Sequence, residues 1–485
     1  MQALFRGMRA TKSLDALQHD PTVRGGAGQL RRTLGLWQLT AIGVGGIVGV
    51  GVFVLTGTAA ARLAGPAVAI SFLVAGVASA LAALCYAEFA GMIPVAGSAY
   101  TYGYAVLGEL VAWIIGWDLL LEYTLVVAAV AIGLGGYLNA LLELVGLALP
   151  VWAQGAPGTG DGRMVNLAAV LVCLFVAWLL ARSTRESARF NAAMVVVKMA
   201  VIALVIGVGL FYVKPENLTP FAPFGFDGVV AGAAVVFFAV YGYDTLTTAA
   251  EEAVNPQRDL PRAVLLSLAV AMVAYVLVSI VLTGMAPYQT LNVDAPVTKV
   301  FTDAGLAGVS GVIAAAAVAG ITSVLLAFAL AGSRIWFAMS RDGLLPRWFA
   351  RVHPVRRTPY RPTWVIGVIT AGVAGFVDLG TVTDLANIGT LVAFIIVCVC
   401  VLVLRRTRPD APRSFRTPAI WLVAPAGALA SAWLITHLKP VTWERFAIWM
   451  VFGLLVYLGY GYRRSLLRRG ADQGAAEGGQ PAGPD

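Results

Sequence analysis

Charged residues are scarce in this 485-residue chain: Asp, Glu, Lys and Arg make up 12% of it, whereas 59% is hydrophobic. Soluble domains carry about 25% charged residues, so a string of soluble domains is excluded. The four cysteines all lie inside apolar runs, and neither a disulfide framework nor a zinc ribbon is expected. The sequence has no phosphate-binding loop and only three histidines, which argues against an ATP-driven pump or a membrane enzyme.

What the chain has instead is a series of apolar runs, each close to the roughly 20 residues that a helix needs to cross a bilayer. These runs predict an all-α membrane protein with twelve transmembrane helices. The predicted segments are 36–61, 66–92, 104–138, 164–182, 190–212, 226–249, 263–285, 307–339, 363–377, 385–404, 418–436 and 445–462.

The distribution of basic residues predicts how these segments are oriented. With both termini in the cytoplasm, 27 of the 34 Lys and Arg residues fall on the cytoplasmic side, six fall on the other side, and Lys198 stays inside a segment. Cytoplasmic loops show this bias, which therefore explains the basic composition without a nucleic-acid partner. We expect a multi-pass protein of the cell (inner) membrane with both termini cytoplasmic.

Two of the twelve segments are interrupted at their middle. Segment 36–61 contains five glycines within 43–51, and each glycine weakens a helix by about 1 kcal/mol relative to alanine. Segment 226–249, five segments later, carries a glycine and Asp244 at its middle. Unwound backbone survives in a bilayer only around a cavity or a protein-lined site. Matching interruptions five segments apart predict an inverted-repeat secondary transporter that binds its substrate near the midplane.

The glycine run has two other interpretations. Small residues four apart, such as Gly45 and Gly49, allow membrane helices to pack closely. Packing alone does not explain why an interruption containing an acid recurs five segments later. The spacing also approaches that of a dinucleotide-binding loop, but such a loop requires a strand–helix context that is missing here.

Several motifs resemble those of one transporter family. They are the glycines of 43–51 followed by Phe53, Tyr86-Ala87-Glu88 with Pro94-Val95-Ala96-Gly97-Ser98-Ala99-Tyr100, Gly116-Trp117-Asp118 with Glu122-Tyr123, the stretch 249–262, and Ser340-Arg341-Asp342-Gly343. With these motifs the sequence resembles the amino acid-polyamine-organocation superfamily, and most closely the bacterial members of its cationic amino acid transporter family. The resemblance implies a LeuT-like fold, a five-plus-five inverted repeat followed by two helices.

The resemblance also divides the chain into five parts. Residues 1–33 form a basic cytoplasmic segment, 34–212 the first repeat, 213–404 the second repeat, 405–462 the last two helices, and 463–485 a cytoplasmic tail. The tail has too little apolar content to fold and is expected to be disordered.

Carried over by position, the resemblance places a zwitterionic amino acid between the two interruptions. The backbone N–H groups of Val50 and Gly51 would bind its carboxylate, and backbone carbonyls would bind its ammonium. These carbonyls belong to Ile47, Phe238, Ala239 and Tyr241. Helix ends support the placement, because their N–H groups favour anions and unwound carbonyls favour cations. Phe238 would also cover the substrate from the outer side.

Lys198 is the one lysine deep within a predicted helix, about 14 Å along that helix from Arg189. A cation at this depth is expensive and marks a functional site by default. The plain alternative is a side chain that snorkels to the surface. The resemblance implies that Lys198 carries the coupled proton where sodium binds in sodium-driven relatives, with Thr322 and Ser323 as its hydrogen-bond partners.

The acidic residues have open roles. Glu122 lies one helical turn after Asp118, so both can face the same cavity. For Asp118 the preferred interpretation is a structural carboxylate that accepts interhelical hydrogen bonds, whereas Glu122 is equally consistent with a structural role and with proton coupling. Glu88 is expected to form a cap or a salt bridge, and Glu251 and Glu252 are expected to pair with arginines at an inner gate.

The predicted function is proton-coupled uptake of L-amino acids by alternating access, and the protein is not expected to be an enzyme. Its partners would be the amino acid, protons and the lipid bilayer, with no metal, cofactor or nucleic acid. A small membrane subunit is neither predicted nor excluded. The alternatives are a transporter or exchanger of arginine and lysine, and an amino acid sensor or channel on the same fold.

The expected substrates are small neutral amino acids such as alanine. Val240 and Leu325 would narrow the side-chain pocket, and Asp244 is the nearest acid that could pair with a long cationic side chain. An unpaired buried charge costs several kcal/mol, so arginine should be transported weakly. Replacing Leu325 with serine should widen the pocket.

Overall fold

The protein is described here by a computed structural model. The described residues are 34–92, 98–144, 146–182, 187–247, 253–353 and 358–466. In these ranges the regular elements are helices, and the only β-pairing is two isolated bridges. The all-α class predicted from the sequence is confirmed.

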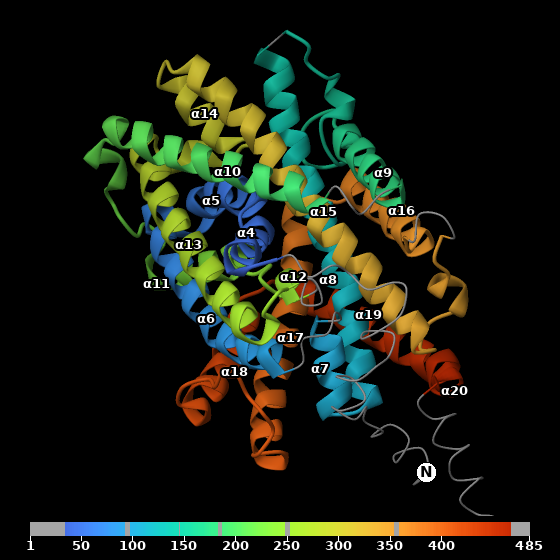
Figure 1. Ribbon diagram of the computed structural model, residues 1–485. Helices are drawn as coiled ribbons and strands as arrows, with labels where there is room; N and C mark the ends of the chain where they lie inside the picture. Colours follow the sequence, from blue (N-terminus) through green and yellow to red (C-terminus); the bar gives the residue numbers. More distant parts are fainter. Residues whose placement is uncertain are drawn as a thin grey trace, which may run out of the picture.

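The helices follow one another along the chain with short connections (Figure 1). The first half contains α4 (Leu36–Ile47), η1 (Gly51–Leu55), α5 (Thr56–Ala59), η2 (Ala60–Ala64), η3 (Gly65–Ala67), α6 (Val68–Met92), α7 (Ser98–Val106), α8 (Glu109–Leu144), η4 (Val151–Ala153), α9 (Leu167–Arg182), α10 (Ser187–Gly209), η5 (Leu210–Tyr212), η6 (Pro215–Leu218), α11 (Gly225–Val240) and α12 (Asp244–Thr247). The second half contains α13 (Pro256–Met285), η8 (Tyr288–Leu291), α14 (Pro296–Asp303), α15 (Ala307–Arg341), η9 (Arg347–Ala350), α16 (Tyr360–Phe376), α17 (Leu379–Thr407), α18 (Ile420–Thr436), α19 (Pro440–Val456), η10 (Tyr457–Gly461) and α20 (Tyr462–Arg464).

Among the described residues, eight helical stretches are long and apolar enough to cross a membrane. They are Gly51–Met92, Glu109–Leu144, Ala193–Tyr212, Gly225–Thr247, Pro256–Met285, Ala307–Arg341, Leu379–Thr407 and Pro440–Arg464. Three shorter apolar helices, α4, α9 and α18, accompany them. The predicted segments overlap helices, but not one to one. Segment 36–61 is divided between α4 and the start of the stretch from Gly51 to Met92, and segment 104–138 is divided between α7 and α8. Within the stretch from Gly51 to Met92 the chain turns at Gly65, where φ is +62°.

The long helix α8 connects much of the bundle (Figure 1). It packs against α15 and α17, while α6 packs against α11 and α13, and α13 also contacts α4. Large apolar side chains remain exposed on the outermost helices, for example Leu422 and Leu429 on α18 and Ile448 and Val451 on α19. Lipid tails are as apolar as leucine, so such side chains need no protein cover in a bilayer.

Glu88 joins the end of α6 to the segment that follows α17. Its carboxylate accepts hydrogen bonds from the Arg405 Nε at 2.7 Å, from the Arg413 Nε at 3.1 Å and from the Thr417 backbone N–H at 2.8 Å. The Glu88 side chain is 1% exposed. The salt bridge expected for this residue from the sequence is therefore confirmed, and its role is structural.

Replacing Glu88 with alanine is expected to destabilise the protein by about 3 kcal/mol, because it leaves two guanidinium groups without their buried partner. Thermal unfolding of the purified protein in detergent measures the effect as a lower Tm. The exposed carboxylate Asp410 provides a matched control, and Asp410→Asn should leave Tm unchanged. Equal Tm values for the two variants would show that the Glu88 contacts contribute nothing.

The ordered chain continues past residue 463, where the sequence analysis placed the start of a disordered tail. Ser465 is buried, and its hydroxyl donates to the Glu109 carboxylate, which also accepts from the Tyr457 hydroxyl at 2.9 Å. The first residues of the predicted tail are therefore held to the bundle at Ser465, because a buried acid at the start of α8 needs hydrogen-bond donors. The rest of the predicted tail and the basic segment 1–33 lie outside the described residues.

Candidate substrate and coupling site

The first predicted interruption is confirmed. Helix α4 ends at Ile47, and Val48 has an extended backbone with φ −77° and ψ 107°. Helical structure resumes with η1 at Gly51. The first N–H groups of a helix have no partner within it, so the restart after the break presents donors and a positive dipole end.

The second predicted interruption is also confirmed. Helix α11 ends at Val240, Tyr241 is extended, and Gly242 has φ +115°, a conformation that residues with a side chain rarely adopt. The chain becomes helical again at Asp244, the first residue of α12. The last carbonyls of α11 are left without a partner in the helix, and they favour a cation.

The two interruptions touch each other through glycines. A Cβ atom added to Gly46 would lie 2.7 Å from the Gly242 carbonyl oxygen, and one added to Gly242 would lie 2.8 Å from the Gly46 oxygen. Gly51 packs in the same way on α11, because a Cβ there would lie 2.6 Å from the Ala239 Cα. The backbone of the first break thus lies directly against the second.

Lys198, on α10, extends its side chain into the first break. Its Nζ donates to the carbonyl oxygens of Gly45 at 2.7 Å and of Val48 at 2.8 Å, and to the Ser323 hydroxyl at 3.2 Å. The residue is 0% exposed, so it does not snorkel to the surface. The carbonyls that the break removes from α4 are therefore satisfied by a lysine from another helix.

The two hydroxyls expected beside Lys198 behave differently. Ser323 contacts the lysine amine and also donates to the Gly320 carbonyl at 2.7 Å. Thr322 donates to the Val318 carbonyl of its own helix at 2.7 Å. The role predicted for Thr322 in proton coupling stays a prediction.

Several tyrosines complete the polar contacts around the first break. The Tyr275 hydroxyl donates to the Ile47 carbonyl at 2.8 Å, and the Tyr137 hydroxyl donates to the Phe53 carbonyl at 2.7 Å. A carbonyl oxygen has two lone pairs, so Ile47 keeps one for a further donor. The sequence analysis missed both tyrosines, because single tyrosines on distant helices form no periodic pattern.

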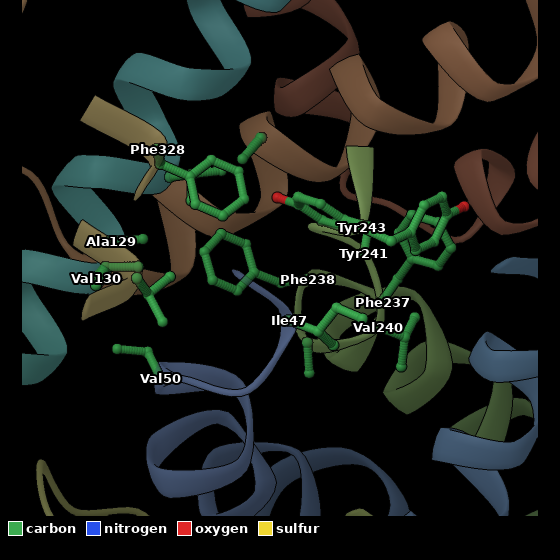
Figure 2. Close-up of a cluster of buried hydrophobic side chains, with 14 of the residues drawn as sticks. Ile47, Val50, Ala129, Val130, Phe237, Phe238, Val240, Tyr241, Tyr243 and Phe328 are labelled. Carbon is green, nitrogen blue, oxygen red and sulfur yellow. The ribbon is translucent and has the colours of Figure 1, made fainter. Parts of the chain in front are cut away.

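Apolar side chains form a buried cluster beside the breaks (Figure 2). Phe238 lies at their centre, with Phe328 on one side and Ile47 and Val50 on the other. The Phe328 ring also packs edge-on against Tyr123 at a centroid distance of 5.5 Å. Phe328 therefore belongs to the apolar cluster beside the breaks, a position that the sequence analysis did not predict.

The residues expected to set the side-chain pocket are all buried. Val240 ends α11, and Leu325 lies on α15 three residues before Phe328, on nearly the same helix face. Both positions agree with a narrow apolar pocket, although their contact with a substrate stays a prediction.

Asp244 forms the acidic end of this region. The Tyr123 hydroxyl donates to its Oδ2, whereas its Oδ1 has no hydrogen-bond partner among the described residues. The Tyr241 hydroxyl is also buried without a partner in this part of the chain. Glu122 precedes Tyr123 on α8 and is 2% exposed. The link from Tyr123 to Asp244 thus ties the helix that carries Glu122 to the second break.

Asp118 differs from the other acids of α8. It is fully buried, and neither carboxylate oxygen has a hydrogen-bond partner within the described ranges. Gly389 of α17 approaches it so closely that a Cβ there would lie 2.7 Å from the Asp118 Oδ1. The interhelical hydrogen bonds expected for Asp118 are not present in this arrangement. Glu251 and Glu252 lie outside the described residues.

Two broken helices in contact, with a buried lysine at the first break, lie inside an apolar helical bundle. This arrangement is typical of multi-pass membrane transporters. The chain belongs to the amino acid permease family, whose pattern matches residues 34–456. It is thus a member of the amino acid-polyamine-organocation superfamily, as its motifs predicted.

Individual relatives cover most of the chain. The methylthioribose transporter of Bacillus subtilis (strain 168) is 46% identical over 469 residues, which are 97% of this chain and 100% of the relative. The branched-chain amino acid permease BcaP of the same organism is 45% identical over 447 residues, or 92% of this chain and 96% of the relative. The vacuolar cationic amino acid transporter 4 of Arabidopsis thaliana is 41% identical over 392 residues, which are 79% of this chain and 65% of the relative.

Proposed function

We propose that this permease takes up small neutral L-amino acids together with protons by alternating access. The single observation that carries the proposal is the contact of the buried Lys198 amine with the Gly45 and Val48 carbonyls of the first break. A titratable cation there couples protonation directly to the backbone that would bind substrate. On this proposal the twelve helical segments include two inverted repeats of five, and both termini face the cytoplasm of a cell (inner) membrane.

The coupled step is a proton transfer at the Lys198 Nζ. The protonated amine donates to Gly45, Val48 and Ser323 and so holds α4 against α10 and α15. When Nζ releases its proton towards the cytoplasm, the charge is lost and these contacts weaken. The first helix can then move and release the substrate on that side. Glu122 and Thr322 are the further candidates on the proton path.

The substrate head groups would bind between the breaks. The N–H groups of Val50 and Gly51 favour the carboxylate, since they begin the second half of a broken helix. The ammonium would meet carbonyls, one of which, that of Ile47, also accepts from Tyr275. The others belong to Phe238, Ala239 and Tyr241. Phe238 would cover the bound amino acid, in keeping with its central place in Figure 2.

The preference for a short side chain rests on the apolar wall. Phe328, Leu325 and Val240 occupy the direction in which a side chain would extend, and all three are buried. The relatives are named for different cargoes: a branched-chain amino acid, cationic amino acids and methylthioribose. The family alone therefore does not decide the substrate.

A cationic amino acid is the second candidate substrate, and one observation favours it. The Asp244 Oδ1 is buried without a hydrogen-bond partner in the described chain, and a guanidinium or ammonium group would supply the missing donor. Such a side chain must first pass Phe328 and Leu325. We therefore place arginine and lysine behind alanine.

Leu325→Ser and Phe328→Ser are expected to raise arginine binding relative to alanine, because either change removes apolar bulk on the path to Asp244. The measurement is the concentration of arginine that halves uptake of labelled alanine. Val312→Ser provides the matched control, since Val312 lies on the same helix with an exposed side chain and should leave the ratio unchanged. If the wild type takes up arginine at a rate equal to or above that of alanine, our interpretation of the pocket is wrong.

Uptake into proteoliposomes tests the proposed function. Labelled L-alanine should accumulate when the outside is more acidic than the inside, and should only equilibrate without a pH gradient. Competition by alanine, valine, leucine, arginine and methylthioribose then ranks the cargoes. Uptake of labelled methylthioribose without uptake of labelled alanine would overturn the amino acid assignment. Binding of L-alanine without uptake of any labelled compound would favour a sensor.

A further inference from the structure

Two connected hollows lie at the end of α8 that is remote from Ser465. The larger has a volume of about 420 Å³ and is lined by the last turns of α8, by the segment after it and by α14. The smaller, of about 70 Å³, reaches inward to Val54 and Gly133. The residues that line both hollows are Gly136, Gln154, Arg163 and Asp294.

The smaller hollow ends beside the first break. Gly133, on its wall, packs against Val50 so closely that a Cβ at Gly133 would lie 2.5 Å from the Val50 Cγ2. The other end of α8 contacts Ser465, which follows the basic residues Arg463 and Arg464. Basic segments lie on the cytoplasmic side, so the larger hollow opens towards the outside.

The larger hollow contains three acids and two bases. Arg163 pairs with Asp294 at 3.1 Å, and Lys299 pairs with Asp303 at 2.6 Å. The third acid, Glu143, is exposed, and its carboxylate makes no ion pair or hydrogen bond within the part of the chain that the structure describes. The Glu143 carboxylate is therefore available to pair with a cation.

Asn139 supplies a second free acceptor on the same wall. Its Oδ1 is shielded from solvent and has no hydrogen-bond partner in the described ranges. It lies four residues before Glu143 on α8, so the two side chains share one helix face. Two unsatisfied acceptors next to two guanidinium or ammonium groups match a ligand that is cationic at one end and anionic at the other.

We propose that the larger hollow is an outer binding site for the ammonium and carboxylate groups of an amino acid, which it holds before the amino acid reaches the central site. Glu143 accepts hydrogen bonds from the ammonium, and so does the Asn139 Oδ1 once that side chain turns into the hollow. Arg163 donates to the carboxylate in place of Asp294. The volume lies within the roughly 300–1,000 Å³ of small-molecule pockets. This inference rests on the proposed transport of amino acids.

The Arg163 exchange gives the outer site a route inward. The Arg163–Asp294 pair lines both hollows and joins the segment after α8 to the loop before α14. When Arg163 turns to the carboxylate of the ligand, this link opens. The amino acid can then pass to the smaller hollow and to the first break.

Thiol protection tests the site with L-alanine as the probe. The four native cysteines are buried, so Ala140→Cys, on the wall of the larger hollow, introduces one reactive thiol. A membrane-impermeant methanethiosulfonate added outside right-side-out vesicles should label it. L-Alanine should slow labelling at least about fivefold, whereas a mixture of acetate and methylamine should not. Labelling that L-alanine leaves unchanged would overturn the proposal.

Additional substitutions show whether L-alanine protects the thiol by binding in the hollow or by causing a conformational change that buries it. In the Ala140→Cys background, Glu143→Gln and Arg163→Gln should each abolish protection. The exposed residues Asp161 and Arg62, outside the hollow, provide the matched controls Asp161→Asn and Arg62→Gln, which should keep it. Protection that survives both Glu143→Gln and Arg163→Gln would overturn the proposal.

A variant of the central site completes the experiment. Ala129 lies in the apolar cluster of Figure 2, and Ala129→Phe, or Ala129→Leu if the larger side chain prevents folding, should fill that space. L-Alanine should still protect the Ala140→Cys thiol in this variant. Loss of protection would show that L-alanine acts by binding at the central site. Uptake by the unmodified protein distinguishes the two proposals: uptake without protection refutes the outer site alone, whereas protection without uptake refutes the transport function.

Discussion

Lys198→Ala is expected to abolish accumulation of L-alanine driven by a proton gradient. The substitution removes the only amine that contacts the Gly45 and Val48 carbonyls in the described chain, and with it the group that we propose carries the proton. Exchange of labelled for unlabelled alanine across the membrane needs no net proton movement and should be retained in part. The measurement compares gradient-driven accumulation with alanine exchange in the same proteoliposomes.

The control for Lys198 is an exposed lysine. Lys214→Ala should accumulate alanine as the wild type does, because Lys214 lies in a loop. Replacing sodium with another cation should not change uptake by the wild type or by Lys214→Ala, since the family resemblance implies that the Lys198 amine stands where sodium binds in sodium-driven relatives. Full gradient-driven accumulation by Lys198→Ala would disprove the coupling role.

Gly242→Ala is expected to reduce uptake to below about a tenth of the wild-type rate, which corresponds to roughly 1.4 kcal/mol. Two costs add: the side chain is strained at φ +115°, and its Cβ would lie 2.8 Å from the Gly46 oxygen. The two breaks must then separate, which disturbs both halves of the central site. Tm of the purified variant should fall together with uptake.

Gly158 provides the control that isolates the close approach. Its φ is +79°, and a Cβ there would meet nothing within 4 Å, so Gly158→Ala carries the conformational strain without the clash. It should leave uptake unchanged. Gly46→Ala carries the clash without a left-handed backbone and should resemble Gly242→Ala. If Gly46→Ala transports normally, contact between the breaks is not required.

The two breaks could be predicted from the sequence because local composition determines them. Five glycines within nine residues, and a glycine beside a buried acid, are unfavourable in any helix. The depth of Lys198 followed from counting residues along α10. Ser323 entered only through the family resemblance, yet the structure places it beside the lysine.

The remaining contacts depend on how distant helices meet, which no single segment encodes. The partners of Glu88 lie more than 300 residues away along the chain. Tyr275 and Tyr137 reach the first break from α13 and α8. The sequence analysis expects the Gly51 N–H to bind the substrate carboxylate. Gly51 also packs against Ala239, so a side chain there would displace α11 and would not test substrate binding alone.

The unbroken course of α8 has a mechanical consequence. Tyr123, tied to Asp244, lies roughly 21 Å from the Glu109 end of the helix and roughly 32 Å from its Leu144 end. If α8 rotates as a rigid body about Tyr123, its two ends move in opposite directions. A tilt of about 10° displaces the Leu144 end by roughly 5 Å and the Glu109 end by roughly 4 Å. One rotation of α8 would thus widen the protein on one face of the membrane while narrowing it on the other.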